Sequence, residues 1–229
     1  MAEQGWLDCT DPQKMLAFLG GKWGERKLRL FACACCRRIW HLLTDARSKR
    51  AVEGAERFVD GTAGRREMVR AYLAACEATR HSWQSPDKQE EPRAPIYLPP
   101  GHAAATSAAA PKMTGQMAQH VAECAADAEK GTADEKPFQA RLLRDIFGNP
   151  LHPVALAPAR MTPAVLNLAQ AAYDNRLLPS GLLDNTGLAI LADSLEEAGF
   201  ANADILSHLR GPGPHVRGCW PVDLILGKR

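Results

Sequence analysis

Hydrophobic residues recur along most of this chain at spacings of three and four, which is the period of an amphipathic α-helix. The clearest segment is 24–43, where one stripe contains Leu28, Phe31, Ala32, Cys35, Ile39 and Leu42. A second stripe beside it contains Cys33, Cys36, Trp40 and Leu43. Two adjacent apolar faces predict a helix at the centre of a bundle, with the first stripe buried.

Further helices are predicted where a residue able to cap a helix precedes an apolar stripe. The predicted starts are Thr10-Asp11-Pro12, Thr44-Asp45, Thr162-Pro163, and Asn202 or Asp204, and one helix is predicted over 183–198. Glycine marks the predicted ends at Gly20-Gly21, Asp60-Gly61 and Gly148-Asn149-Pro150. Only 96–98 and 154–156 look extended, and both are too short to establish a sheet. The pattern therefore predicts an all-α helical bundle.

A stretch rich in proline and alanine divides the helical pattern. Six prolines between 86 and 111 bracket a tract of small residues at 103–110. Repeated prolines prevent a continuous helix, and alanine side chains offer little area to bury. We therefore predict two helical subdomains, 1–84 and 112–229, joined by a linker or long loop at 85–111.

Composition places the chain among globular proteins of a reducing compartment. Of its 229 residues, 46% are hydrophobic and 24% are charged, the balance of a folded domain. The start shows no secretory signal, and no apolar run has the length of a membrane span. Its seven cysteines are an odd number without the spacing of a secreted disulfide scaffold. These features predict a cytoplasmic protein with no membrane association.

The positive charge of the chain lies in its N-terminal third. Residues 1–80 contain 15 Lys/Arg and 10 Asp/Glu, an excess of five, whereas the whole chain has a net charge of +2. That density is below the density typical of a dedicated nucleic-acid-binding domain. Weak nucleic-acid binding through this third is kept as an alternative function.

Three strings carry a resemblance to other sequences. LRLFACACCRRIW at 28–40, LLRDIFGNP at 142–150 and HVRGCW at 215–220 resemble an uncharacterised bacterial protein family with many paralogues in large-genome environmental species. The resemblance spans most of the chain. It implies no activity, substrate or catalytic residue.

A second resemblance covers 191–199, which is similar to the core of a short helical domain known as a repeat-companion domain. Ser194 stands where that motif usually has tryptophan. The resemblance implies a protein-interaction module.

The cysteines of segment 24–43 are candidate metal ligands. A structural zinc site needs four ligands, and Cys33 and Cys36, three residues apart, could supply two of them. Cys9 or Cys76, together with His41, could complete the set. The competing interpretation, which we prefer, is that these cysteines pack the interior as small hydrophobic residues. The sequence thus predicts no cofactor, with zinc as the alternative.

The C-terminal segment offers a candidate catalytic thiol. Cys219 follows His215 and Arg217 closely, and His208 is a further histidine that could lie near it in space. The competing interpretation is a structural latch, in which the run Gly211-Pro212-Gly213-Pro214 reverses the chain. A latch cysteine should be buried and have no histidine within hydrogen-bond reach, whereas a catalytic cysteine should be accessible.

The preferred functional hypothesis is a non-enzymatic interaction or scaffold protein whose partner is another protein. It rests on the absence of the usual catalytic motifs from the sequence and on the companion-domain resemblance. The alternatives are a small metal- or thiol-dependent enzyme using Cys219 and His215 or the Cys33/Cys36 cluster, and the weak nucleic-acid binder. The sequence leaves the oligomeric state open.

Overall fold

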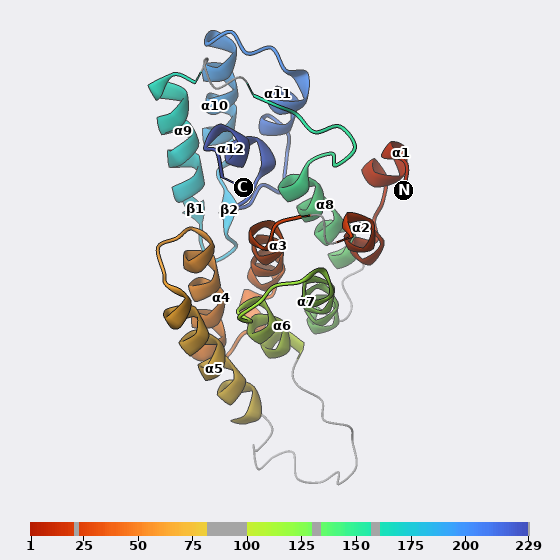
Figure 1. The fold of residues 1–229 in the computed structure, drawn as a ribbon, viewed down its shortest axis with the longest axis vertical. Coiled ribbons are helices and arrows are strands. Elements are labelled where there is room, and N and C mark those ends of the chain that lie inside the picture. Colours follow the sequence, from red (N-terminus) through yellow and green to blue (C-terminus); the bar gives the residue numbers. More distant parts are fainter. Residues whose placement is uncertain (21–22, 82–99, 130–133, 157–160, 229) are drawn as a thin grey trace.

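The computed structural model describes residues 1–20, 23–81, 100–129, 134–156 and 161–228. These residues form twelve α-helices, one 3₁₀ helix and one two-stranded antiparallel sheet, which confirms the all-α fold class (Figure 1). The first eight helices are α1 (Glu3–Leu7), α2 (Pro12–Leu19), α3 (Glu25–Arg38), α4 (Ala46–Val59), α5 (Arg65–His81), α6 (Pro100–Ala108), α7 (Gly115–Ala128) and α8 (Glu135–Phe147). The 3₁₀ helix η1 (Trp40–Leu42) follows α3.

The C-terminal part of the chain forms four more helices and the small sheet. They are α9 (Pro163–Asp174), β1 (Arg176–Leu177), β2 (Leu182–Leu183), α10 (Asn185–Glu197), α11 (Ala203–Leu209) and α12 (Trp220–Ile225). The helix predicted from Leu183 therefore begins two residues later, because Leu183 pairs with Arg176 in the sheet. Residues 154–156, which looked extended in the sequence, form no strand.

Side-chain caps start several helices where the sequence predicted them. Asp11 accepts hydrogen bonds from the backbone N–H groups of Gln13 and Lys14, and Pro12 is the first residue of α2. Thr162 caps α9 in the same way through the N–H of Val165. These caps satisfy N–H groups that have no partner inside the helix, so the local sequence sets where each helix begins.

Helix α3 lies at the centre of the bundle and contacts α4, α6, α7 and α8 (Figure 1). Phe31, Cys35 and Ile39 are fully buried, as predicted for the first stripe. Leu42 was predicted to be buried with them, and that is wrong, because its exposed fraction is 37%. The α-helix ends at Arg38, and the tighter 3₁₀ turn that follows does not continue a stripe of period 3.6.

The buried residues divide into two hydrophobic cores at a place the sequence did not indicate. The first core includes residues of every helix from α1 to α8, together with Val216. The second contains residues of α9 to α12 and Cys219. The division thus falls between Phe147 and Val165, whereas the sequence analysis placed α7 and α8 in a C-terminal subdomain of residues 112–229.

Part of the predicted linker is a packed helix. Residues 100–108 form α6, and Ala104, Ala105 and Ala108 on it are fully buried. The small alanine side chains let α6 lie close against α7 and α4, so they contribute to the first core by close packing and not by large area. Residues 85–99 of the predicted linker lie outside the described residues.

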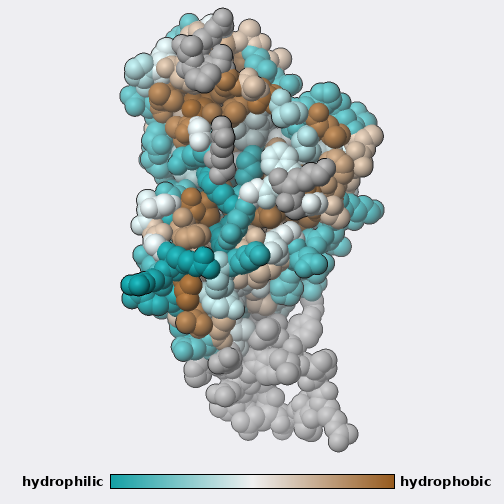
Figure 2. Space-filling model, in the orientation of Figure 1, coloured by the Kyte–Doolittle hydropathy of each residue, from teal (hydrophilic) through white to brown (hydrophobic). Residues whose placement is uncertain are grey.

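Charged side chains join the two cores. Glu56 on α4 accepts hydrogen bonds from Arg37 on α3, at 2.7 and 3.0 Å, and from Arg176 on β1, at 2.9 Å. Asp60, at the end of α4, pairs with Arg217 near the C-terminus. Figure 2 shows hydrophilic residues across the middle of this face, between the end that contains α9 to α12 and the end that contains α4 and α5.

Among the described residues, no helix combines the length and the apolar character that crossing a membrane requires.

Candidate metal centre

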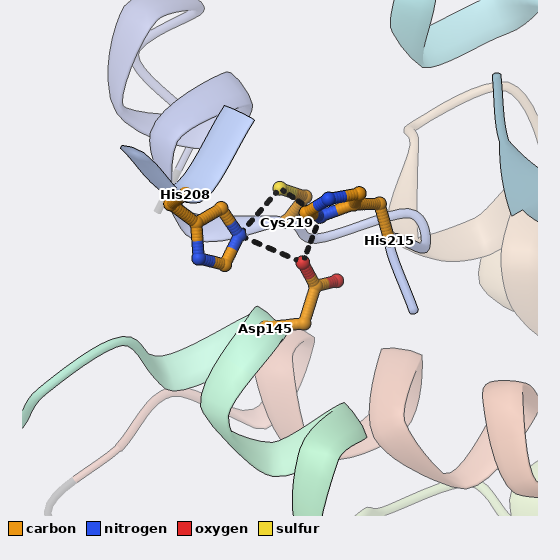
Figure 3. A group of neighbouring side chains, drawn as sticks. All are labelled: Asp145, His208, His215 and Cys219. Atoms are coloured by element: carbon orange, nitrogen blue, oxygen red, sulfur yellow. Dashed lines mark hydrogen bonds and ion pairs between the residues drawn. The ribbon is translucent and has the colours of Figure 1, made fainter. Parts of the chain in front are cut away.

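Four side chains with metal-ligating atoms meet between the two cores. Asp145 lies near the end of α8, where its side chain faces the C-terminal segment and is buried. His208 belongs to the last turn of α11, His215 to the loop after it, and Cys219 directly precedes α12 (Figure 3). The ligating atoms of the four residues all lie within 4.8 Å of one another.

The backbone around Cys219 brings this segment against α3. Gly218 has a φ of +91°, a conformation that side chains with a Cβ rarely adopt. A Cβ added at Gly218 would also lie 2.8 Å from Cδ1 of Leu30 on α3. Glycine at this position therefore lets the chain approach α3 closely enough for Cys219 to reach Asp145.

The sulfur–nitrogen distances within the cluster are close to those between the ligands of a tetrahedral ion, and the oxygen–nitrogen distances are shorter by a few tenths of an ångström. Oδ1 of Asp145 lies 3.0 Å from Nε2 of His208 and 2.9 Å from Nδ1 of His215. Sγ of Cys219 lies 3.4 Å from Nε2 of His208 and 3.8 Å from Nδ1 of His215. Tetrahedral zinc at its usual bond lengths separates nitrogen and oxygen ligands by about 3.3 Å and sulfur and nitrogen ligands by about 3.5 Å.

Two hydrogen bonds to backbone groups around the cluster orient His215 and Asp145, as such bonds orient the ligands of metal sites. Nε2 of His215 lies 3.2 Å from the carbonyl oxygen of Gly211, so this nitrogen donates and Nδ1 is directed at the centre. Oδ2 of Asp145 accepts the backbone N–H of Val216 at 2.9 Å, which leaves Oδ1 directed toward both histidines.

A third hydrogen bond, from Trp220 to His208, is compatible only with a cluster that holds no ion. The indole N–H of Trp220 donates to Nδ1 of His208 at 3.2 Å. An indole nitrogen is only a donor, so the proton of His208 lies on Nε2 and faces Asp145. A neutral histidine that binds a metal through Nε2 carries its proton on Nδ1 instead, so an ion and the Trp220 hydrogen bond exclude each other.

The charges of the cluster stabilise one another. Burial alone would raise the pKa of Asp145, but its hydrogen bonds and charge interactions with His208 and His215 outweigh burial and lower that pKa. Burial alone would lower the pKa of His215, but Asp145 outweighs it and raises that pKa. Without an ion, the centre is thus a carboxylate held between two imidazoles.

Cys219 satisfies one criterion of each sequence interpretation. It is fully buried, as a latch cysteine should be, yet two histidines lie within hydrogen-bond reach, as a site cysteine requires. Burial raises the pKa of its thiol well above the usual value, and the charge of Asp145 adds to this increase. A buried thiol with a raised pKa is a poor nucleophile, and it becomes a thiolate readily only beside a cation.

The metal ligands proposed from the sequence lie apart from this cluster. Cys33 and Cys36 are buried in the first core, and Cys9 donates its S–H to the carbonyl oxygen of Asp11. His41 has an exposed side chain that pairs with Glu129. Within the described part of the chain, no three of Cys33, Cys36, Cys9 and His41 form a group that could hold an ion.

Two residues of the cluster were not among the sequence candidates. His208 was noted only as a possible neighbour of Cys219, and Asp145 was not singled out. The available signal was the helical period of 138–147, where Asp145 stands seven residues after Phe138 and three after Leu142 and so on the apolar face. A buried carboxylate needs a partner, which marks such a position as worth pairing with distant histidines.

No family model, curated protein or solved structure matches this chain. Its candidate function therefore rests on the geometry of the cluster.

Proposed function

We propose that this chain is a zinc-binding helical protein, in which the ion fastens the C-terminal segment 208–220 to α8. One observation carries the proposal: a carboxylate, two imidazoles and a thiol from three separate elements place their ligating atoms within 4.8 Å of one another. Thiolate and imidazole together with one carboxylate form a ligand set that suits zinc, whereas magnesium and calcium prefer oxygen alone.

The closed ligand set supports a structural role for the ion. Catalytic zinc sites usually keep one of four positions for water or substrate, and here the protein supplies all four. Asp145, His215 and Cys219 are buried, and the side chain of His208 is 20% exposed. An ion at this position would link the first core, through Asp145, to the second, through Cys219. Such a brace suits the non-enzymatic interaction or scaffold module that the sequence favours.

The nucleic-acid alternative draws less support from the fold. Six of the eleven arginines in residues 1–80 pair with carboxylates of the chain itself. The pairs are Arg26–Asp223, Arg29–Glu25, Arg37–Glu56, Arg38–Glu135, Arg47–Asp45 and Arg57–Glu67. Guanidinium groups used in this way are not available to neutralise phosphates.

Elemental analysis of the protein, purified after zinc reconstitution and desalting, tests the proposal. Wild-type protein should retain one zinc ion per chain, and Cys219→Ser and Asp145→Asn should each retain little. Cys124→Ser is the matched control, because Cys124 lies 3.6 Å from Nε2 of His120 on the same helix but has no further ligand beside it among the described residues. Wild-type protein without zinc, or full zinc content in Cys219→Ser, would overturn the proposal.

The Trp220 contact favours a second candidate, a latch without an ion. In that account the network of His208, Asp145 and His215 alone holds the segment on α8. The two accounts differ in what zinc does to Trp220, since an ion on His208 Nε2 moves the proton to Nδ1 and removes the acceptor of the indole N–H. Zinc should change the emission of Trp220 in the first account and leave it unchanged in the second. Comparison with Trp220→Phe isolates that signal.

A further inference from the structure

A cleft of about 680 Å³ lies beside the cluster and is lined by residues of α1, α3, α8, α11 and α12. His208 and Trp220 belong to its wall, so the cleft and the candidate metal centre share two residues. Its volume falls within the range of small-molecule sites in proteins.

The aromatic walls of the cleft are held in place by the fold. The rings of Trp23 and Phe147 meet edge to face with centroids 5.4 Å apart. Trp220 packs directly on Gly148, where an added Cβ would lie 3.1 Å from the indole ring. The positive φ of Gly148, +65°, and this close approach both require glycine, so the position of Trp220 is fixed before any ligand arrives.

Three positive side chains line the cleft: Lys27, Arg144 and Lys228. The carboxylates of Asp223 and Asp145 act on Lys27 at longer range. Lys228 lies over the ring of Tyr173. The ammonium group of Lys27 donates to the carbonyl oxygen of Ile146 at 2.8 Å and lies 5.4 Å from the centre of the Trp23 ring. Arg144 donates to the carbonyl oxygens of Trp6 and Cys9. Within the described part of the chain, neither Lys27 nor Arg144 forms an ion pair within 4.0 Å.

Three acidic residues line the cleft, and two of them are engaged with other groups, while the third, Asp204, stands in the first turn of α11. Glu3 pairs with His152 at 2.9 Å, and Asp223 pairs with Arg26. Burial lowers the pKa of Lys27, which means that its ammonium group is poorly solvated where it stands. An anion beside Lys27 would restore the stabilisation that the ammonium loses by burial.

We propose that this cleft binds a small organic anion with a planar aromatic body, its anionic group toward Lys27 and its ring against Trp23 and Trp220. Planar apolar surfaces select the body of such a ligand by stacking, and the ammonium of Lys27, which has no carboxylate within 4.0 Å among the residues that the structure describes, selects the sign of its charge. The preference for an anion rests on Lys27, which is outside the cluster, whereas Trp220 donates to His208 of the cluster.

Two probes with the same ring and opposite charge test it by ligand-observed NMR and calorimetry. Indole-3-propionate should bind at least about tenfold more tightly than tryptamine. Lys27→Met keeps the length of the side chain and should bring the two affinities together, and Lys27→Arg should restore the preference. Lys14→Met, which removes an exposed lysine of α2, should change neither affinity.

The wild-type comparison needs no variant, so the proposal can fail even where a variant does not fold. Equal affinity for the two probes, or no saturable binding of indole-3-propionate at millimolar concentration, would overturn it. A preference that survives in Lys27→Met would also overturn it. The same titration on Asp145→Asn separates the two proposals, since loss of zinc should leave the preference for indole-3-propionate in place.

Discussion

The cysteines of α3 and the single cysteine of the C-terminal segment differ in what surrounds the sulfur. Cys33, Cys35 and Cys36 lie on one helix and are buried in the first hydrophobic core. Cys219 stands alone in its segment, yet two imidazoles and a carboxylate from α8, α11 and the following loop converge on it. The cysteines that are neighbours along α3 pack as hydrophobic side chains. Cys219, by contrast, meets ligating side chains that come from separate elements.

The largest effect is expected in the first core. Phe31 on α3 is fully buried, so Phe31→Ala should lower the free energy of unfolding by about 3–5 kcal/mol. Leu42→Ala, at a position predicted as core but 37% exposed, should cost less than about 1 kcal/mol. Denaturant unfolding of both variants measures the difference. Similar decreases in the free energy of unfolding of the two variants would contradict the finding that the buried stripe ends at Ile39.

Removal of zinc should have the next largest effect, and only through the Cys219 cluster. At free zinc a thousandfold above its dissociation constant, binding stabilises the folded state by about 4 kcal/mol. For a chain of this length that corresponds to a fall in Tm of about 10 °C on chelation. Scanning calorimetry should show the fall in wild-type protein and in Cys36→Ala.

Cys219→Ser should already have the lower Tm and should not respond to the chelator. An equal response in Cys219→Ser and wild-type protein would place the ion elsewhere, and loss of the response in Cys36→Ala would make α3 its site.

The features of this structure that could be predicted from the sequence are those that depend on residues close together in the chain. The helical period and the caps at Asp11 and Thr162 are local, and the helices begin where these residues stand. The place of α6 in the bundle could not be predicted from the local sequence. The alanines at 103–110 contribute to a core only when another helix packs against them. The cluster is the extreme case. Asp145 is 63 residues from His208, and no spacing rule joins them.

The burial of Cys219 could be predicted from the sequence, whereas its two histidine neighbours could be named only as candidates. Its burial follows from an apolar segment near the end of the chain. The histidines within reach of its sulfur follow from the path of the Gly-Pro loop and from the close approach at Gly218, which a sequence does not display.

A smaller change should follow acidification through the charges that join the two cores. Burial alone would raise the pKa of Glu56, but Arg37 and Arg176 outweigh burial and lower it from 4.5. The unfolded chain therefore takes up this proton at a higher pH than the folded protein does. The stabilisation is present above pH 4.5 and is lost as the pH falls through the lower pKa of the folded state.

Glu56→Gln should remove this part of the acid sensitivity, and Glu197→Gln, at an exposed position of α10, should not. Urea unfolding as a function of pH measures both. If the acid limb of the curve for Glu56→Gln matched that of wild-type protein, the stabilising role of these charges would be wrong.

The contrast between the two cysteine regions is tested most directly by the absorption spectrum of the cobalt(II) form. Cobalt(II) accepts the tetrahedral ligand sets that zinc accepts and reports them through visible bands and a thiolate charge-transfer band. Wild-type protein and Cys36→Ser should show both features, and Cys219→Ser should lose the thiolate band. A thiolate band that persists in Cys219→Ser and disappears in Cys36→Ser would contradict the account.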